Sequence, residues 1–576
     1  MRRSLGTAFV AAICVIGAAP SRALAFDPAL ETKNFAKTSE RVANVTGKPE
    51  FLQRLHQQNL DSQVQWVELR ANDPERNPAN VCARRSQECA GDVRFYDWEE
   101  SGYGVMTPVI FTARSGAVIS GMVWGTVAGP AQRPGIVITT GSVQAPETLY
   151  WGLAASFAKA GYVVLTYDVQ GQGQSDTFGE GPDQQEGVPS QAGQPFYDGT
   201  EDALDFLLSG PANPYDPRPS CGNANDGVGT DHSPKHERRV GEGLATAFNP
   251  MHERVDSSRI AIAGHSLGAS AVSFIGQRDP RVDAIVAWDN LAQPGQGFAN
   301  VPDCPSNPDS RVSPAISKPA MGISNDYGLT PTPFTSDPNP EAKNGAFQAY
   351  SGAAVDSMQV NIRGGTHYES SLLPCCTVPV FATATWRGQD FVQWYTQAWF
   401  DKYVKGGDST ADARLLTDRW RNDTLTQGVD QNDDPNMFSF YYRSRYDFTL
   451  GGGGPALCDD MRTGCAEMGP DGAPPNYDFV AAAQTPDGPG PTPADTDGDG
   501  LADPADSCPT APGTAGGNGC PRPQGAAGDG ARPANRARPR CGKLRKKLRK
   551  ADRPAAKLRI RHKLRRRGCL RRRARR

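Results

Sequence analysis

A serine between two glycines, in the pentapeptide GHSLG at residues 264–268, is the first candidate for chemistry in this chain. Ser266 follows the apolar run RIAIAG and precedes LGASAVSFIGQ, a helix-like stretch rich in small residues. A strand, a tight turn and a helix form the context in which a Gly-x-Ser-x-Gly serine is presented as a nucleophile. The sequence therefore predicts a nucleophilic Ser266, and the alternative is an ordinary strand-to-helix turn.

A serine nucleophile needs a general base, and the chain has seven histidines from which to supply it. In a doubly wound hydrolase sheet the chain order is serine, acid, histidine. Two histidines lie downstream of Ser266: His367, in MQVNIRGGTHYESS, and His562, in a basic tail. Because His367 follows a strand-like run and a pair of glycines, we expect it at the sheet edge that carries Ser266 and predict it to be the base.

The acid that orients His367 has two candidates. Asp326 lies just beyond the strand-like run KPAMGIS, one strand before the histidine strand, and it is the acid that we predict. Asp289, which follows DAIVAW, is the rival, because some hydrolases place the acid one strand earlier. For the oxyanion hole we predict the backbone amides of Leu267, next to the nucleophile, and Ser142, in the loop after PGIVITTG.

The elements that must position these residues alternate between strand-like and helix-like patterns from about residue 105 to 450. Seven short apolar or β-branched runs between residues 117 and 365 are bounded by Gly, Pro or Asp and are expected to be strands, and helix candidates such as LYWGLAASFAKAG separate several of them. This alternation predicts an α/β fold with a mostly parallel, doubly wound sheet covered by helices on both faces. The closing helix is expected in GQDFVQWYTQAWFDKYVKG, and a polar segment at 26–104 precedes the domain.

Residues 105–450 resemble the α/β-hydrolase superfamily. The stretch GYVVLTYDVQGQGQSD is similar to the D-x-R-G-x-G-x-S loop of many members, with Gln170 where arginine is common. The resemblance implies hydrolysis of small-molecule or lipid carboxylic esters, as in esterases and lipases, through an acyl-enzyme and without a catalytic cofactor. It places the triad at Ser266, Asp326 and His367. Two alternatives stay open: a serine peptidase of the same fold, and a calcium-stabilised surface-binding protein whose hydrolase domain is inactive.

The N-terminus has the pattern of a secretory signal peptide, MRRSLGTAFVAAICVIGAAPSRALA, with cleavage expected after Ala25. No later stretch is long and apolar enough to span a bilayer, so we expect a secreted or cell-surface protein. Of the 13 cysteines, Cys14 leaves with the signal and 12 remain, an even number that suits disulfides. The candidate pairs are Cys82–Cys89, Cys221–Cys304, Cys458–Cys465, Cys508–Cys520 and Cys541–Cys569.

A linker at 451–490 leads to an acidic loop within residues 491–521. Its sequence DTDGDGLADPAD places carboxylates at positions 1, 3, 5, 9 and 12 and glycine at position 6, which matches a Ca²⁺ loop. With ADSCP following, the unit resembles a thrombospondin type 3 repeat, in which calcium is structural. The predicted ligands are Asp495, Asp497, Asp499, Asp503 and Asp506.

The C-terminal tail, residues 522–576, is strongly basic. Residues 532–576 hold 23 Lys and Arg against one acid; with 61 basic and 63 acidic residues in the whole chain, the remainder carries 38 and 62, a charge of about −24. Such a cation cluster binds polyanions through counterion release. For an exported protein, an anionic cell envelope or acidic polymer is the expected partner rather than a specific nucleic acid.

Overall fold

The computed structural model divides the chain into two compact units, residues 1–492 and 493–576. Every described residue belongs to the first unit. The predicted signal peptide, the five aspartates of the acidic loop and the basic tail lie outside the described residues, so the inferences about them stay predictions. The structure describes residues 27–41, 49–78, 104–142, 145–184, 192–222, 226–297, 300–328, 331–335, 337–371, 386–406, 410–417 and 437–468.

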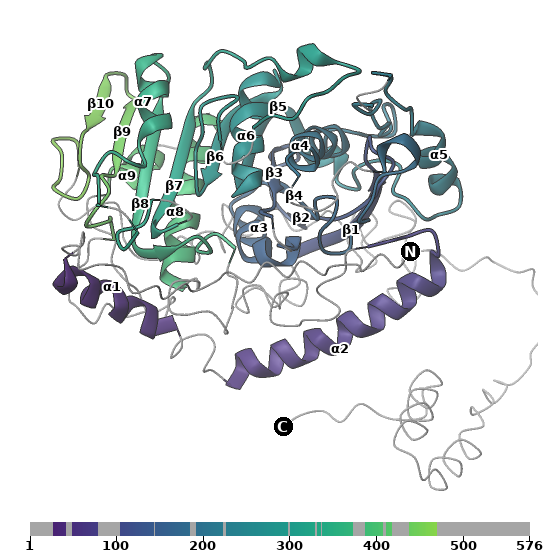
Figure 1. Ribbon diagram of the computed structural model, residues 1–576, viewed down its shortest axis with the longest axis horizontal. Coiled ribbons are helices and arrows are strands. Elements are labelled where there is room, and N and C mark those ends of the chain that lie inside the picture. Colours follow the sequence, from purple (N-terminus) through teal and green to yellow (C-terminus); the bar gives the residue numbers. More distant parts are fainter. Residues whose placement is uncertain are drawn as a thin grey trace, which may run out of the picture. The chain divides into compact units, whose positions relative to one another are not determined.

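A mixed sheet, ten-stranded within the described residues, forms the centre of this unit in the order β1-β2-β4-β3-β5-β6-β7-β8-β9-β10 (Figure 1). Strands β3 to β8 run parallel, whereas β1, β2, β9 and β10 join the two edges through antiparallel pairs. The expected α/β class with a mostly parallel sheet is therefore confirmed. The strands are β1 Gly104–Thr112, β2 Val118–Thr126, β3 Arg133–Thr139, β4 Val163–Tyr167, β5 Val255–His265, β6 Val282–Trp288, β7 Ala320–Tyr327, β8 Ser357–Thr366, β9 Arg445–Thr449 and β10 Pro455–Cys458.

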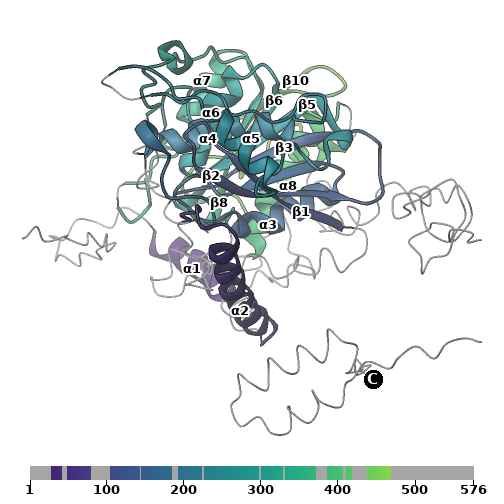
Figure 2. The same ribbon diagram turned by 90° about the vertical axis from the view of Figure 1, so that its right-hand side faces the viewer.

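Helices cover both faces of the sheet (Figures 1 and 2). Helices α3 (Trp151–Lys159) and α8 (Trp386–Tyr403) pack on one face, and α4 (Gln194–Leu207) and α6 (Leu267–Arg278) pack on the other. None of the helices in the described ranges is both long and apolar enough to cross a membrane. The other helices are α1 Pro28–Arg41, α2 Pro49–Asn72, α5 Ser233–Gly241, α7 Gly345–Gly352 and α9 Ala411–Leu415, with short 3-10 turns η4 Glu147–Tyr150, η5 Gly181–Asp183, η6 His252–Arg254 and η7 Pro308–Arg311.

The apolar strands are explained by this double covering. In β3, Ile136 and Ile138 are buried against α3 and α8, while Val137 between them is buried in the cluster formed with α4 and α6. Successive side chains of a strand point to opposite faces, so a strand that is covered on both sides must be apolar throughout. The uninterrupted apolar runs in the sequence therefore became central strands.

The direction in which successive strands are added to the sheet reverses at β3. The chain passes from β3 through α3 to β4 on one side, and then returns to place β5 on the opposite side of β3. Open α/β sheets bind ligands at the carboxyl ends of the strands where the winding reverses in this way. Ser266 directly follows β5 and therefore lies beside this point.

The sheet continues beyond residue 450, where the sequence pattern had suggested that the domain ends. Strands β9 and β10 extend it past β8, and Tyr446, Phe448 and Ala456 are buried in the same cluster as α3 and α8. Both strands are short and neither was expected from the sequence. The described core thus includes residues up to at least Cys458.

Two disulfides link described cysteines, Cys221–Cys304 and Cys458–Cys465. Both pairs were predicted from the sequence and are confirmed. They differ in the length of chain that they close, because the first joins residues 83 positions apart and the second joins residues 7 positions apart. The other predicted pairs lie outside the described residues.

Removing the Cys221–Cys304 bond should destabilise the fold more than removing Cys458–Cys465. In the chain-entropy model a disulfide restricts the unfolded chain more as its loop lengthens, which gives about 4–5 kcal/mol for the longer loop and about 2 kcal/mol for the shorter one. The two double Cys→Ser variants should be compared by calorimetric melting without reductant. Equal melting temperatures, or a lower one for the Cys458–Cys465 variant, would contradict the expectation.

Candidate active site

Ser266 lies on the turn between β5 and α6. Its backbone dihedrals are φ 56° and ψ −117°, a left-handed conformation that costs a residue with a Cβ about 1–3 kcal/mol. The Ser266 amide donates a hydrogen bond to the Trp288 carbonyl at 3.0 Å, which ties the turn to the end of β6. The residue is 4% exposed. This is the sharp strand-to-helix turn that a Gly-x-Ser-x-Gly nucleophile requires.

Glycine at position 268 is needed because α6 approaches the end of β3 closely. A Cβ on Gly268 would lie 2.5 Å from the carbonyl oxygens of both Thr139 and Thr140. No larger residue can occupy this position unless the helix moves away from the sheet. The first turn of α6 and the loop that follows β3 consequently lie side by side, as the predicted oxyanion hole requires.

The two amides predicted for the oxyanion hole lie on these neighbouring segments. Leu267 is the first residue of α6, where the backbone N–H groups have no acceptor within the helix and the helix dipole is positive. Ser142 lies two residues beyond Thr140, in the loop that touches the helix. Among the described residues neither amide donates a hydrogen bond.

The loop containing Ser142 is supported by the glutamine-rich loop that follows β4. The Gln172 side chain donates to the Gly141 carbonyl at 2.5 Å and accepts from the Ala145 amide at 3.0 Å. In the same loop, Asp168 accepts from the amides of Glu147 and Gln174, both at 2.7 Å. The D-x-Q-G-x-G-x-S stretch, residues 168–175, therefore stabilises the segment after β3 through these hydrogen bonds.

His367 lies in the loop after β8, with its Nδ1 2.6 Å from Oδ2 of Asp289. Because the carboxylate accepts this bond, the imidazole carries a proton on Nδ1, and its Nε2 is the acceptor. Burial alone would raise the pKa of Asp289, but the hydrogen bond and charge of His367, together with the charge of Lys343, hold it below its usual range. Asp289 is therefore an ionised partner that orients the histidine.

Asp326, the acid predicted from the sequence, does not occupy this position. The sequence pattern placed it beyond a strand ending at Ser324, but β7 continues to Tyr327 and Asp326 lies within it. No hydrogen bond or ion pair joins Asp326 to His367, although the structure describes both residues. The partner of His367 is the rival, Asp289, which directly follows β6. His367 is therefore paired with the aspartate after β6 and not, as predicted, with the one on β7.

The Asp326 carboxylate instead anchors helix α1 and the end of β8. It accepts hydrogen bonds from the Asn34 side chain at 3.1 Å, from the Gly364 amide at 2.8 Å and from the Ser439 hydroxyl. Asn34 is completely buried. An acid that appeared suited to catalysis therefore joins three segments that are far apart in the sequence.

Replacing Asp326 by asparagine should remove part of the pH dependence of stability. Burial, only partly offset by these hydrogen bonds, raises the pKa of Asp326 from 3.8 to about 6. Between these values the folded state binds more protons than the unfolded state, so ionisation of Asp326 lowers stability as pH rises from 4 to 6. The loss is complete above pH 6 and amounts to roughly 3 kcal/mol.

Chemical denaturation at pH 4 and pH 7 tests this expectation. An asparagine side chain cannot ionise, so Asp326→Asn should not lose this stability as pH rises. The wild type should therefore lose roughly 3 kcal/mol more of its unfolding free energy than the variant does between pH 4 and pH 7. Other acids that titrate in this range contribute equally to both proteins and cancel. An identical pH dependence in the two proteins would show that Asp326 has an ordinary pKa.

Lys343 is a buried cation near the site that the sequence did not reveal. Its ammonium group donates to the Asn325 carbonyl and lies 4.8 Å from the centre of the Tyr442 ring. Its charge favours the ionised forms of both Asp289 and Asp326. The lysine stands in the polar stretch NPEAKNG, where no strand or motif marks it.

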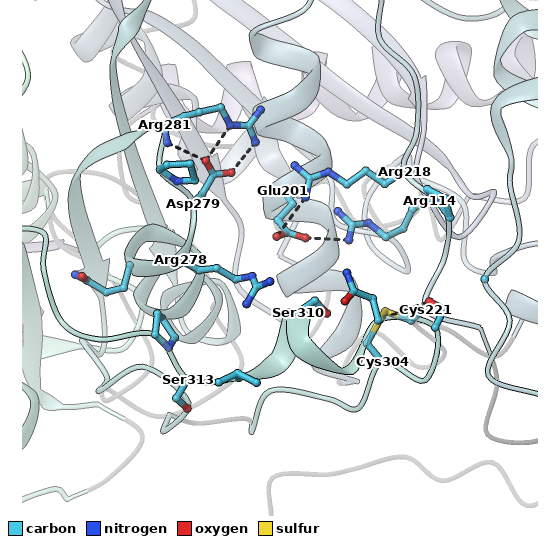
Figure 3. Close-up of a pocket in the computed structure, with 18 of the residues that line it drawn as sticks. Arg114, Glu201, Arg218, Cys221, Arg278, Asp279, Arg281, Cys304, Ser310 and Ser313 are labelled. Atoms are coloured by element: carbon cyan, nitrogen blue, oxygen red, sulfur yellow. Dashed lines mark hydrogen bonds and ion pairs between the residues drawn. A yellow bond between two sulfur atoms is a disulfide. The ribbon is translucent and has the colours of Figure 1, made fainter.

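A cavity of about 1260 Å³ lies at the other end of α6 and is separate from these residues (Figure 3). None of Ser266, Asp289 and His367 lines it. Figure 3 shows the Cys221–Cys304 disulfide at its edge and ion pairs across its wall, among them Arg281 with Asp279 at 2.6 Å. A helix of this length places the cavity about 16–18 Å from the serine. Its charged lining residues are Arg114, Arg218, Arg278, Arg281, Glu201 and Asp279.

Comparison with protein-family models and with curated proteins found no match to this chain. The described residues also contain no group of three or more His, Cys, Asp or Glu side chains that could hold a metal ion. The predicted calcium ligands, Asp495 to Asp506, are outside that part of the chain. The functional inference therefore rests on the geometry of the site.

Proposed function

We propose that the protein is a secreted serine hydrolase of the α/β-hydrolase type that cleaves carboxylic esters through an acyl-enzyme. The observation that carries this proposal is the 2.6 Å contact between His367 Nδ1 and Asp289, at the sheet edge where Ser266 stands on a left-handed turn. A serine, a histidine and a carboxylate in these roles define a catalytic triad irrespective of their positions in the chain. Asp289 takes the place first assigned to Asp326.

In the proposed reaction, His367 Nε2 accepts the proton of the Ser266 hydroxyl as its Oγ attacks the ester carbonyl. Ionised Asp289 stabilises the imidazolium that forms. The amides of Leu267 and Ser142 donate to the oxyanion. The imidazolium then protonates the departing alkoxide, which leaves as the alcohol. Water, deprotonated in turn by His367, attacks the acyl-enzyme and releases the carboxylic acid and the free serine.

The topology supports the same location for chemistry. The ends of β5, β6 and β8 supply Ser266, Asp289 and His367, and β5 stands where the winding of the sheet reverses. A ligand at this edge would meet the nucleophile and the base together. The two disulfides fit an extracellular setting, where such bonds persist. Calcium in the C-terminal unit and polyanion binding by the tail are proposed as accessory properties.

Labelling with a fluorophosphonate, followed by peptide mapping, tests the proposal. Such a probe phosphonylates an activated serine, so the label should appear on the peptide that contains Ser266. A panel of p-nitrophenyl esters and p-nitroanilides then separates esterase from peptidase activity, and we expect turnover of the esters. A label on another serine, or no label on a folded protein, would contradict the proposal. Turnover of the anilides alone would favour the peptidase.

A further inference from the structure

A buried tyrosine and a buried histidine join the three loops of the candidate active site. The Gly141 amide donates to the Tyr150 hydroxyl at 2.9 Å, and this hydroxyl lies 2.8 Å from Nδ1 of His265. Nε2 of His265 lies 2.7 Å from the His367 carbonyl oxygen. The row of hydrogen bonds therefore runs from the loop after β3, past the turn at Ser266, to the loop after β8.

The two ends of this row determine the direction of every bond in it. An amide N–H can only donate, and a carbonyl oxygen can only accept. The His367 carbonyl can only accept, so Nε2 of His265 must carry a proton. In a neutral ring Nδ1 is then the acceptor, and the Tyr150 hydroxyl, whose oxygen accepts from the Gly141 amide, donates its proton to Nδ1. The neutral Nε2–H form of His265 therefore satisfies all three bonds.

His265 is thus suited to holding the structure and not to acting as a second base. Both of its ring nitrogens are engaged, and the residue is 2% exposed. Burial, together with the neighbouring charge of His367, lowers the pKa of His265 to about 3, so the ring is neutral at physiological pH. The rings of His265 and His367 are nevertheless close, with centroids 4.5 Å apart.

The surrounding packing leaves these groups little freedom. Tyr150 is completely buried, and its ring stacks on Trp288 with an interplanar angle of 10°. Trp288 is held in turn by a 3.0 Å hydrogen bond from its Nε1 to the Thr396 hydroxyl. A Cβ on Gly141 would lie 2.8 Å from Nδ1 of His265, so the loop after β3 packs directly against the histidine.

We propose that Tyr150 and His265 are positioning residues. They hold His367 and the loop that contains Ser142 in place relative to Ser266. His367 is then held at two points, since Asp289 binds its imidazole and His265 binds its main chain. On the other side, Tyr150 holds the Gly141 amide, next to the Ser142 amide assigned to the oxyanion hole. This inference rests on the proposed hydrolase function.

Tyr150→Phe is the direct test, because phenylalanine fills the same space but lacks the hydroxyl. The Gly141 amide and Nδ1 of His265 both lose their partner. Misplacement of catalytic groups by about 1 Å can cost about 100-fold in rate. On p-nitrophenyl acetate we expect kcat to fall about 10-fold to 100-fold while KM changes less than about threefold, because the Tyr150 side chain is completely buried and takes no part in the proposed substrate contacts.

Two substitutions of His265 provide an independent series. In His265→Gln the side-chain amide can still donate to the His367 carbonyl, whereas His265→Leu loses both hydrogen bonds. We therefore expect kcat to decrease in the order wild type, His265→Gln, His265→Leu. If leucine is tolerated as well as glutamine, the bond to His367 does not position the base. This series also tests the proposal should Tyr150→Phe fail to fold.

Tyr162→Phe is the matched control. Tyr162 is also completely buried, and its hydroxyl donates to Asp401 at 2.7 Å. It precedes β4, however, and so lies at the N-terminal end of the parallel strands, whereas Ser266 follows the C-terminal end of β5. We expect it to lower the melting temperature about as much as Tyr150→Phe while kcat stays within about twofold of wild type. Equal losses of kcat in the two variants would mean that stability alone explains the effect, and would overturn the inference.

Ser266→Ala separates failure of this inference from failure of the proposed function. If Ser266→Ala is inactive but Tyr150→Phe and the His265 variants keep wild-type kcat, the triad stands and the positioning role is wrong. If Ser266→Ala hydrolyses p-nitrophenyl acetate as fast as wild type, the proposed function itself fails. Both outcomes come from the same assay on the full-length protein.

Discussion

Ser266→Ala is expected to abolish ester hydrolysis, with kcat falling by about 10⁴-fold or more and the fold intact. The substitution removes only the hydroxyl, and alanine has the same Cβ at the left-handed turn as serine does. No acyl-enzyme can form without the Oγ atom. The measurement is turnover of p-nitrophenyl acetate by the purified protein, with circular dichroism to show that the variant is folded. Undiminished turnover would remove Ser266 from the mechanism.

Ser273→Ala is a suitable control for this result. Ser273 lies two turns further along α6, is completely buried, and its hydroxyl donates to the Ala269 carbonyl at 2.7 Å and accepts from the Ala292 amide at 3.1 Å. Its loss should destabilise the protein by about 1–3 kcal/mol but leave kcat nearly unchanged. If both serine variants were inactive, damage to helix α6 would be the better explanation.

The second large effect is expected at the acid, where Asp289→Asn should lower kcat by about 10³-fold to 10⁴-fold. In the wild type the carboxylate accepts a hydrogen bond from Nδ1 of His367 at 2.6 Å. An asparagine can present its NH₂ group instead, which favours the tautomer protonated on Nε2. In that form the imidazole cannot accept the proton of Ser266, so acylation is blocked. Acylation rates should be measured by stopped-flow release of p-nitrophenol.

Asp326→Asn distinguishes the two acids. Asp326 holds α1 and the end of β8 and does not contact His367, so its replacement should change stability and its pH dependence while kcat stays within about tenfold of wild type. The contrast between the two Asp→Asn variants is the decisive quantity. A severe loss at Asp326 with a mild one at Asp289 would restore the acid first predicted from the sequence.

Much of the candidate site was predictable because its signals are local. The strand, turn and helix around Ser266 are contiguous in the chain, from Val255 to Arg278, and Gly268 in α6 reflects the close approach of this helix to β3. His367 was predicted from its chain order and its place after a strand, and the structure places it in a loop at the expected edge. The seven strands expected between residues 117 and 365 are all present, because central strands are apolar on both faces.

The strands at the two edges of the sheet were less predictable, because they are not apolar on both faces. Strands β1, β9 and β10 lie at or near its ends, and β9 and β10 are short, with buried residues alternating with exposed or partly exposed ones. Such segments carry little of the apolar signal that marks a central strand. They became recognisable only through their antiparallel partners.

The identity of the acid depended on tertiary structure. Both aspartates follow apolar runs, and nothing in either run shows that β7 continues to Tyr327 while β6 ends at Trp288. That difference arises from pairing, since the last residues of β7 bond to β8 across an irregularity in the register. Asp326 then lies inside the sheet, where Asn34, some 290 positions away, covers it.

Types of residue and local periodicity therefore predicted the strand-to-helix turn that carries Ser266 and the loop that carries His367. The partners of Asp289, Tyr150 and His265 were decided by contacts between segments separated by 78 to 115 residues. A hydrogen bond between distant segments depends on strand order and on where each strand stops, and neither property is encoded in a short window of sequence. Local patterns can name candidates for such a site, but only the folded chain shows which of them are hydrogen-bonded, as His367 is to Asp289.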